Sequence, residues 1–399
     1  MKKTISFSKI IFWTGAISLL LVYIILWAEM IASPSERTGT DFIAFYSAGR
    51  IAQERGSSKV YDIDLQQEVQ ENLLGFSIID NQPLLYNHLP FLIPLLKLIM
   101  QESYTLSFSI WLLIQITIYG VSFYILAQLF PENWTQNNRG KIITSGALFF
   151  PVFVSLLLGQ DTAFLFLGIS FFLYGILRQK DFLAGGGLAL TLVRPHLTLA
   201  LALPVMIKNK KAFSYFVGLG AALALLSFGI LGIEGTQDFI RILTISGEGT
   251  WYGMKEASMI NLIGLMSRTF SFLDPSLVQT IGWVFYFISI VILFFFWTFT
   301  AKETSSLLGL SVIFSLFFAP HLHYHDLSLL FFPLMLILVS RKLSLRQEKV
   351  SFVLLAISFL LIFTKSIPFL YFSFPYTLLL GMTILLIGKQ GITQSQNPP

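Results

Sequence analysis

The residues best suited to chemistry in this chain stand in polar breaks between apolar stretches. Asp41 follows a Gly39-Thr40 turn, shortly after the first apolar run. A carboxylate beside a membrane surface can take the proton from a hydroxyl group while lipid holds the other reactant. We therefore predict that Asp41 is a general base. The alternative role is to cap the helix that it opens or to stabilise the dipole of that helix.

Arg194 stands in the middle of an apolar stretch and precedes Pro195, a residue that breaks helices. A guanidinium is costly there unless it meets water, a carboxylate or an anionic ligand. Its planar fork of donors pairs well with phosphate oxygens. We expect Arg194 to bind a phosphate group. The alternative is an ion pair with another helix, for which Asp161 is one candidate.

Three alternating histidines, His321, His323 and His325, precede Asp326. Imidazoles and carboxylates are metal ligands, but alternating side chains at a helix boundary do not point one way unless the segment is extended. We expect one or two of these histidines to bind phosphate or sugar hydroxyls, without a metal ion. A purely interfacial, water-facing role is the alternative.

Two further polar breaks divide the apolar sequence. Gln160 and Asp161 stand between two apolar runs, where they could hydrogen-bond a polar substrate or simply form a turn. The triplet Gly185-Gly186-Gly187 lacks a preceding strand and the lysine of a phosphate-binding loop, so it predicts close helix packing and no nucleotide site. No cofactor is expected.

The elements that must position these residues are membrane helices. Hydrophobic residues make up 55% of the chain and charged residues only 12%, too few to cover a water-facing surface. Apolar runs of about 17 to 25 residues can cross a hydrocarbon core of roughly 30 Å as helices. We predict an all-α, polytopic integral membrane protein. The net charge of +5 is spread over the loops, which argues against nucleic acid as a partner.

Basic residues set the direction of the chain. Lys2, Lys3 and Lys9 place its start in the cytoplasm. Residues 10–32 then lead outward as an uncleaved helix, and 33–85 form an external loop. Amphipathic helices are predicted within that loop, one after Asp41 and one after Asp62, lying on the membrane.

About ten membrane crossings follow from this start, together with half-helices. Residues 89–100 are too short to span and are expected to be re-entrant or interfacial. Residues 183–207 are expected to form a hairpin that turns near Arg194, and one tilted span is the alternative. Residues 1–389 then form a single transmembrane domain, and 390–399 a disordered cytoplasmic tail. The predicted spans are 104–130, 142–158, 161–177, 212–233, 277–300, 304–320, 326–340, 350–364 and 367–388.

This topology predicts that the polar motifs meet at the outer membrane face, with His196 among them. Their order and spacing resemble those of glycosyltransferase family 87, whose polytopic GT-C enzymes use polyprenyl-phosphate sugars, typically of mannose. The shared pattern covers roughly 35–340 and consists of Asp41-Phe42 with Tyr46 and Gly49, Val60-Tyr61-Asp62, Tyr86 with Pro90, Gly159-Gln160, Gly187 before Arg194-Pro195, Asn261 before Gly264-Leu265, and Pro320 with His323 and His325.

The resemblance implies a GT-C fold whose first external loop carries the catalytic aspartate, here Asp41, and it adds Tyr86 and Asn261 to the candidate substrate-binding residues. It implies transfer of a sugar, with inversion, from a polyprenyl-phosphate donor to a hydroxyl of a lipid-linked or surface glycan acceptor. Donor, acceptor and membrane lipid are the expected partners. The chain departs from the family pattern at Leu89, Thr162 and Arg194, where a proline, an asparagine and often a lysine are expected.

Two other functions fit the same features. Broken helices and buried charge also mark transporters and lipid-carrier flippases. Polymerases or ligases of polyprenyl-linked oligosaccharides also use external arginines and histidines. The sequence leaves the sugar, the acceptor, the linkage and the oligomeric state open.

Overall fold

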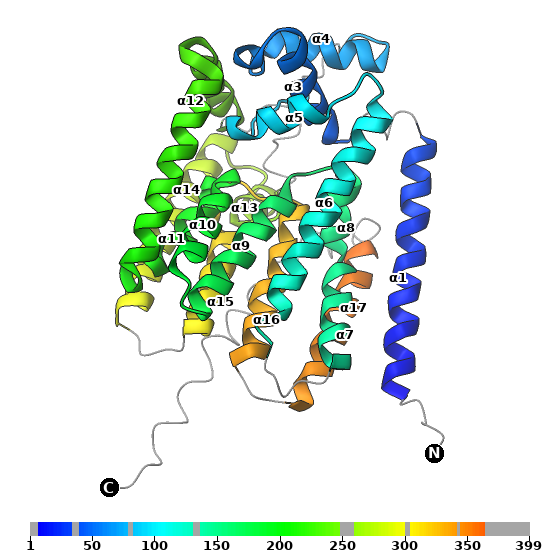
Figure 1. Ribbon diagram of the computed structural model, residues 1–399, viewed down its shortest axis with the longest axis vertical. Helices are drawn as coiled ribbons and strands as arrows, with labels where there is room; N and C mark the ends of the chain where they lie inside the picture. The colour runs from blue at the N-terminus through cyan, green and yellow to red at the C-terminus, as the bar shows by residue number, and fades with distance from the viewer. Residues whose placement is uncertain are drawn as a thin grey trace, which may run out of the picture.

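The computed structural model describes residues 7–33, 40–78, 83–130, 136–247, 259–299, 304–340 and 344–363. Every regular element in these ranges is a helix, as predicted (Figure 1). The α-helices are α1 Phe7–Ala32, α3 Phe42–Glu54, α4 Ile63–Leu74, α5 Ile93–Ile99, α6 Tyr104–Ala127, α7 Gln136–Ala147, α8 Phe150–Leu158, α9 Thr162–Leu177, α10 Asp181–Leu190, α11 Pro195–Lys208, α12 Lys210–Gly247, α13 Leu262–Thr269, α14 Pro275–Phe299, α15 Thr304–Phe318, α16 Phe331–Ser340 and α17 Ser344–Phe363. Short 3₁₀ turns are η1 Ser57–Lys59, η2 Pro90–Leu92, η3 Thr191–Val193 and η5 Tyr324–Leu330.

Several of these helices suit a membrane. Within the described ranges, α1, α6, α12 and α14 are long and apolar enough to cross a bilayer, and the pair α7 and α8, bent by 41°, would make a fifth span. The other apolar helices have 10–17 residues, which is short for a span. The apolar helices identify a membrane protein, while the number of about ten crossings stays a prediction. The predicted span 367–388 and tail 390–399 lie outside the described residues.

Helices α3, α4 and α5 form a cap over one end of the bundle (Figure 1). The two helices predicted after Asp41 and Asp62 are α3 and α4. Asp62 caps α4 by accepting hydrogen bonds from the backbone N–H groups of Asp64 and Leu65 at 3.0 and 3.2 Å. Gln53 fastens α3 to α5, because its side chain donates to two backbone carbonyls just at the end of α5. The short element predicted at 89–100 is η2 followed by α5.

The segment predicted as a hairpin has that form. Helices α10 and α11 meet at η3, and at their far ends Asn209 Nδ2 donates to Asp181 Oδ1 at 2.9 Å. Arg194 therefore lies at the tip. The glycine triplet brings α10 close to α9, as predicted: a Cβ on Gly187 would lie 2.6 Å from the carbonyl oxygen of Gly168. A larger side chain there would push the two helices apart.

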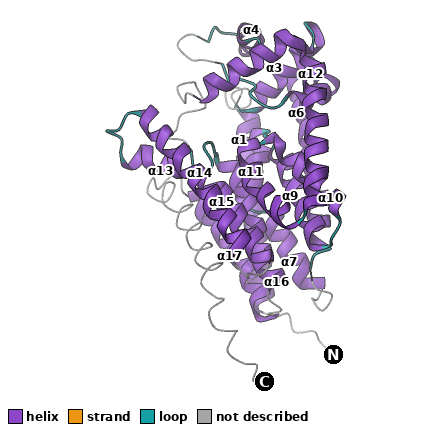
Figure 2. Ribbon diagram, turned by 90° about the vertical axis from the view of Figure 1, so that its left-hand side faces the viewer, coloured by secondary structure: helices purple, strands orange, loops and turns teal. Residues whose placement is uncertain are grey.

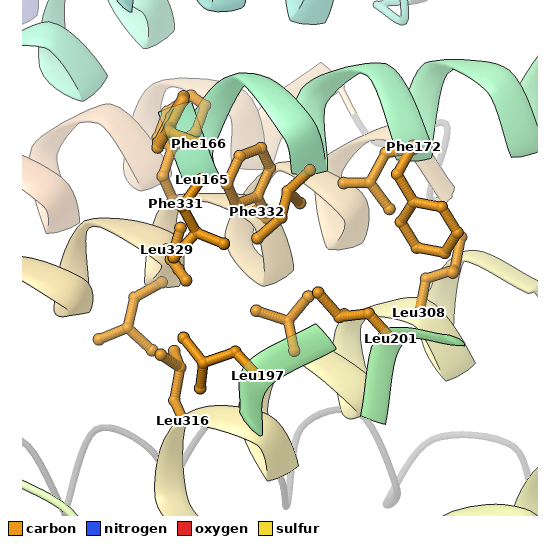
Figure 3. Packing of buried hydrophobic residues seen from close by; sticks show 14 of the residues in the cluster. Leu165, Phe166, Phe172, Leu197, Leu201, Leu308, Leu316, Leu329, Phe331 and Phe332 are labelled. Atoms are coloured by element: carbon orange, nitrogen blue, oxygen red, sulfur yellow. The ribbon is translucent and has the colours of Figure 1, made fainter. Parts of the chain in front are cut away.

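The main core lies beneath the hairpin tip. Buried leucine and phenylalanine side chains of α9, α11, α15, η5 and α16 pack against one another (Figure 3). Because lipid tails are as apolar as leucine, such a core in a membrane is stabilised by close packing more than by removal of apolar surface from water. The packing fixes the helix ends above it, where the polar residues lie. The core residues labelled in Figure 3 are Leu165, Phe166, Phe172, Leu197, Leu201, Leu308, Leu316, Leu329, Phe331 and Phe332.

Helix α12 departs from the sequence prediction. The predicted span is 212–233, but the helix resumes after a kink at Gly232 and continues to Gly247. Its last turns pack on the cap, where Lys59 Nζ lies 2.6 Å from Glu234 Oε1. Contacts with the cap stabilise the part of α12 that follows the kink, which the hydropathy pattern does not predict to be helical. Helix α13 lies at one side of the bundle, below the cap (Figure 2).

Candidate active site

The polar residues of the sequence analysis converge between the cap and the hairpin tip. Asp41 precedes α3 in the cap, Gln160 and Asp161 form the break between α8 and α9, and Arg194 joins η3 to α11. Each lies where a helix begins or ends, so its side chain can leave the apolar bundle. The start of η5 contributes Asp326, which lies within ion-pair distance of Arg194.

Asp41 is held by the neighbouring break and does not cap its own helix. Its side chain makes no hydrogen bond to the backbone at the start of α3. Instead, Gln160 Nε2 donates to Asp41 Oδ2 at 2.6 Å. The capping role that the sequence left open is therefore not found. Oδ1 of Asp41 has no hydrogen-bond partner among the described residues, so one carboxylate oxygen can accept a proton.

Arg194 lies at the centre of the charged groups. Its Nη2 is 2.8 Å from Asp161 Oδ1 and donates to Gln160 Oε1 at 3.3 Å, while its Nε is 3.9 Å from Asp326 Oδ1. Burial alone would raise the pKa of the Asp161 carboxyl, but Arg194 and then His88 outweigh it and hold that pKa well below its usual range. The ion pair with Asp161, left open by the sequence, is present.

His88 belongs to this site although the sequence analysis did not single it out. Its Nδ1 lies 2.8 Å from Asp161 Oδ2 and 3.0 Å from Arg194 Nη1. The ring packs on Phe45 of α3, with 4.5 Å between the ring centroids. A lone histidine ahead of a short apolar helix has no spacing pattern. Only the fold brings it to Asp161.

The four other histidines lie together beside the charged groups. His325 Nε2 is 3.6 Å from Asp326 Oδ1, the ring centroids of His321 and His323 are 4.5 Å apart, and those of His196 and His321 are 6.4 Å apart. Burial lowers the pKa of His321 and His323, that of His323 to about 4. Both imidazoles are therefore neutral at pH 7. Within the described ranges, no three acidic or histidine side chains are arranged to hold a metal ion.

Helix α6 fixes the backbone that carries Gln160 and Asp161. Trp111 Nε1 donates to the Gly159 carbonyl at 2.7 Å, and the buried Gln115 donates to the Gln160 carbonyl. Gly159 has a left-handed φ of 70° and lies against Phe42 of α3. The sequence analysis missed Gln115, although a glutamine inside an apolar span is a signal that could have found it.

Two predicted substrate-binding residues are bonded to the protein itself. Tyr86 is fully buried behind His88, with 5.4 Å between their ring centroids. Asn261 accepts a hydrogen bond from Gly264 N at the start of α13 and donates to the Ala319 carbonyl at 2.6 Å. That second bond holds the loop leading to His321. Direct contact of Tyr86 or Asn261 with a substrate stays a prediction.

Comparison with known families supports the resemblance seen in the sequence. The sequence model of glycosyltransferase family 87 matches residues 88–322, which is more than half of the chain. The matched part begins at His88 and includes Gln160, Asp161 and Arg194; Asp41 lies before it and Asp326 after it. No curated protein matches the chain.

Proposed function

Because the chain belongs to glycosyltransferase family 87 and is therefore a glycosyltransferase, we propose that it moves a sugar from a polyprenyl-phosphate donor to an acceptor hydroxyl, with Asp41 as the general base. The observation that carries this proposal is the position of Asp41: its carboxylate is joined through Gln160 to Arg194, a cation suited to phosphate. Family membership favours a transferase over the transporter that the sequence left open.

The chemistry needs few protein groups. Oδ1 of Asp41 takes the proton of the acceptor hydroxyl as its oxygen attacks the anomeric carbon. The bond from that carbon to the phosphate oxygen breaks, and its electron pair stays with the phosphate. A single displacement of this kind inverts the anomeric centre. Arg194 stabilises the charge that develops on the leaving phosphate.

An apolar cavity beside the charged groups supports a lipid-linked donor. It has a volume of about 260 Å³ and lies between η2, η3 and α12. Its lining includes Leu89, the neighbour of His88, and Leu192, two residues before Arg194. A prenyl chain in this cavity would bring its phosphate to the polar site, and the donor would arrive laterally from the bilayer.

The finer substrate assignments follow from the family resemblance. We propose mannose as the sugar, a lipid-linked or surface glycan as the acceptor, and a site on the extracytoplasmic side of the cell membrane. The basic residues at the start of the chain support that orientation. Gln160, His321, His323 and His325 are the polar side chains that we assign to the sugar and phosphate oxygens.

Transfer assays with purified protein test the proposal. Radiolabelled polyprenyl-phosphate mannose, other prenyl-linked sugars and nucleotide sugars are offered in turn with a membrane lipid extract as the acceptor source. We expect product from a polyprenyl-phosphate sugar, and a loss of about 10²- to 10⁴-fold in Asp41→Asn, because the base is removed. Asp62→Asn is the matched control, since asparagine also caps helices well.

The two halves of the proposal fail separately. Full activity of Asp41→Asn would show that Asp41 is not the general base. Transfer from nucleotide sugars alone would contradict the polyprenyl-phosphate donor, while the family assignment would stay intact.

A further inference from the structure

The apolar cavity beside the charged groups follows one face of α12. This helix runs along one side of the bundle up to the cap (Figure 1), and its contribution to the cavity wall includes Gly220, Leu223, Ser227, Phe228 and Leu231. Residues three and four positions apart lie on the same side of a helix. From Gly220 to Leu231 the helix rises roughly 16 Å, so the cavity is elongated along α12.

The cavity adjoins the polar site. Leu89 follows His88 in the chain, and Leu192 lies in η3 two residues before Arg194. None of the described residues that line the cavity carries a charge. A phosphate or a sugar would lose hydration there without gaining partners. The occupant that fits is therefore the hydrocarbon part of a ligand whose polar head stays with Arg194.

The cavity also reaches the outer surface of α12. Phe228 lines it and keeps 51% of its own surface exposed, on a helix that is long and apolar enough to cross a bilayer. The neighbouring Leu225 and Leu226 are exposed as well. A hydrocarbon chain longer than the cavity can therefore leave it beside Phe228 and continue among the lipid tails.

The volume of the cavity limits how much of a prenyl chain it can hold. An apolar cavity of about 150 Å³ holds a benzene molecule of six carbons, so about 260 Å³ corresponds to about ten carbons, or about two isoprene units. Gly220 keeps part of this space open. A Cβ there would lie 3.4 Å from Leu192 Cδ1, on the opposite wall, so a longer side chain would enter the cavity.

We propose that this cavity is a prenyl subsite of limited capacity: it holds about two isoprene units next to the donor phosphate, leaves the remaining units in the bilayer, and is kept open by Gly220. The inference rests on the proposed donor class. Recognition of the lipid then depends on the units next to the phosphate, and the total chain length has little influence. Donors that differ only beyond the second unit should be used equally well.

The test is transfer kinetics with donors of the sugar that the wild type transfers, linked to dimethylallyl, geranyl, geranylgeranyl or undecaprenyl phosphate. All donors are offered in the same mixed micelles, and KM is expressed as a mole fraction in the micelle, so that partitioning of the chains does not enter it. We expect the wild-type KM to fall by about tenfold from the dimethylallyl to the geranyl donor, because the second unit gains packing contacts. From geranyl to undecaprenyl it should change by less than about threefold, since further units only exchange one apolar environment for another.

The variant Gly220→Leu tests the subsite itself. On the scale used above, its four added carbons occupy about 100 Å³, more than a third of the cavity. We expect KM for the geranyl and longer donors to rise by about tenfold, with kcat nearly unchanged, because the displaced unit loses its contacts while the reacting groups stay in place. If this variant does not fold, Ala224→Leu replaces it, one helical turn further along the same wall.

Gly218→Leu is the matched control. It places the same side chain on the same helix, and nothing lies within 4 Å of its added Cβ. Both variants therefore change the helix propensity of α12 equally, and only one of them fills the cavity. The KM values of Gly218→Leu should equal those of the wild type.

Each outcome decides a different point. An unchanged KM in Gly220→Leu would mean that the cavity holds a bulk lipid or nothing during transfer, and an equal rise in Gly218→Leu would assign the effect to the helix; both overturn the subsite and leave the proposed function intact. A wild-type KM that keeps falling from the geranyl to the undecaprenyl donor overturns the limited capacity. No transfer from any prenyl-phosphate sugar overturns the proposed function together with this inference.

Discussion

The side-chain amide of Gln160 joins Asp41 to Arg194. Its Nε2 donates to Asp41 Oδ2 at 2.6 Å, and its Oε1 accepts from Arg194 Nη2 at 3.3 Å. The candidate base and the candidate phosphate-binding cation are thus bridged by one neutral group. Such an uncharged bridge orients both groups without adding a charge between them, and it leaves Oδ1 of Asp41 without a hydrogen-bond partner among the described residues.

Loss of this bridge should slow transfer without unfolding the protein. In Gln160→Leu we expect kcat to fall by about 10- to 100-fold, because a hydrogen bond to a charged group contributes about 1.5–3 kcal/mol. The measurement is kcat together with the melting temperature of the purified protein in detergent. Gln67→Leu, which removes a glutamine bonded to Glu71 on α4, is the matched control and should keep wild-type kcat. An unchanged kcat in Gln160→Leu would show that Asp41 does not need the bridge.

Local patterns predicted the parts of the site that interrupt an apolar run. Asp41 and Arg194 stand out because a charge beside or within an apolar stretch is costly unless it has a partner. The hairpin tip at Arg194 followed from Pro195 and from basic residues at both ends of the segment. These signals lie within a few residues of the group concerned.

Other features depend on contacts between distant segments. His88 gains its role from Asp161 and Arg194, far along the chain. Gln115 donates to the Gln160 carbonyl from the middle of α6, where the apolar pattern indicates only a span. The last turns of α12 are stabilised by the cap, including the ion pair of Lys59 with Glu234. Hydropathy cannot show such features because it reports each segment alone.

The conformation of Gly159 should matter for activity as well as stability. A Cβ at this position would lie 2.7 Å from Cβ of Phe42, the residue after Asp41. Gly159→Ala should therefore displace the start of α3 and reduce kcat by about tenfold or more, since small misplacements of catalytic groups are costly. Gly75→Ala is the matched control: its φ of 76° is similar, but nothing lies within 4 Å of the added Cβ.

Both glycine variants should lose about 1–2 kcal/mol of stability from left-handed backbone strain. Only Gly159→Ala should also lose activity. Equal kcat in the two variants would show that the contact between residue 159 and Phe42 does not determine the position of Asp41.

The ion pair of Arg194 with Asp161 should show strong coupling in stability. Arg194→Met leaves the buried Asp161 carboxylate without its main partner, so we expect a loss of about 3–5 kcal/mol in the free energy of unfolding. Asp161→Asn removes that uncompensated charge, so the double variant should be more stable than Arg194→Met alone. A double-mutant cycle in mixed micelles measures the coupling. Additive losses would mean that other groups neutralise Asp161.

Acid should destabilise the fold through the loop that carries His321 and His323. Burial lowers the pKa of both imidazoles, that of His323 to about 4, while an unfolded histidine titrates near pH 6.5. Between these values the unfolded chain binds more protons, so stability is fully present above about pH 6.5 and is lost as the pH falls towards 4. The melting temperature of wild type should drop over this window. His323→Gln, which cannot titrate, should show a smaller drop, and an identical pH profile in both proteins would exclude His323 as a cause.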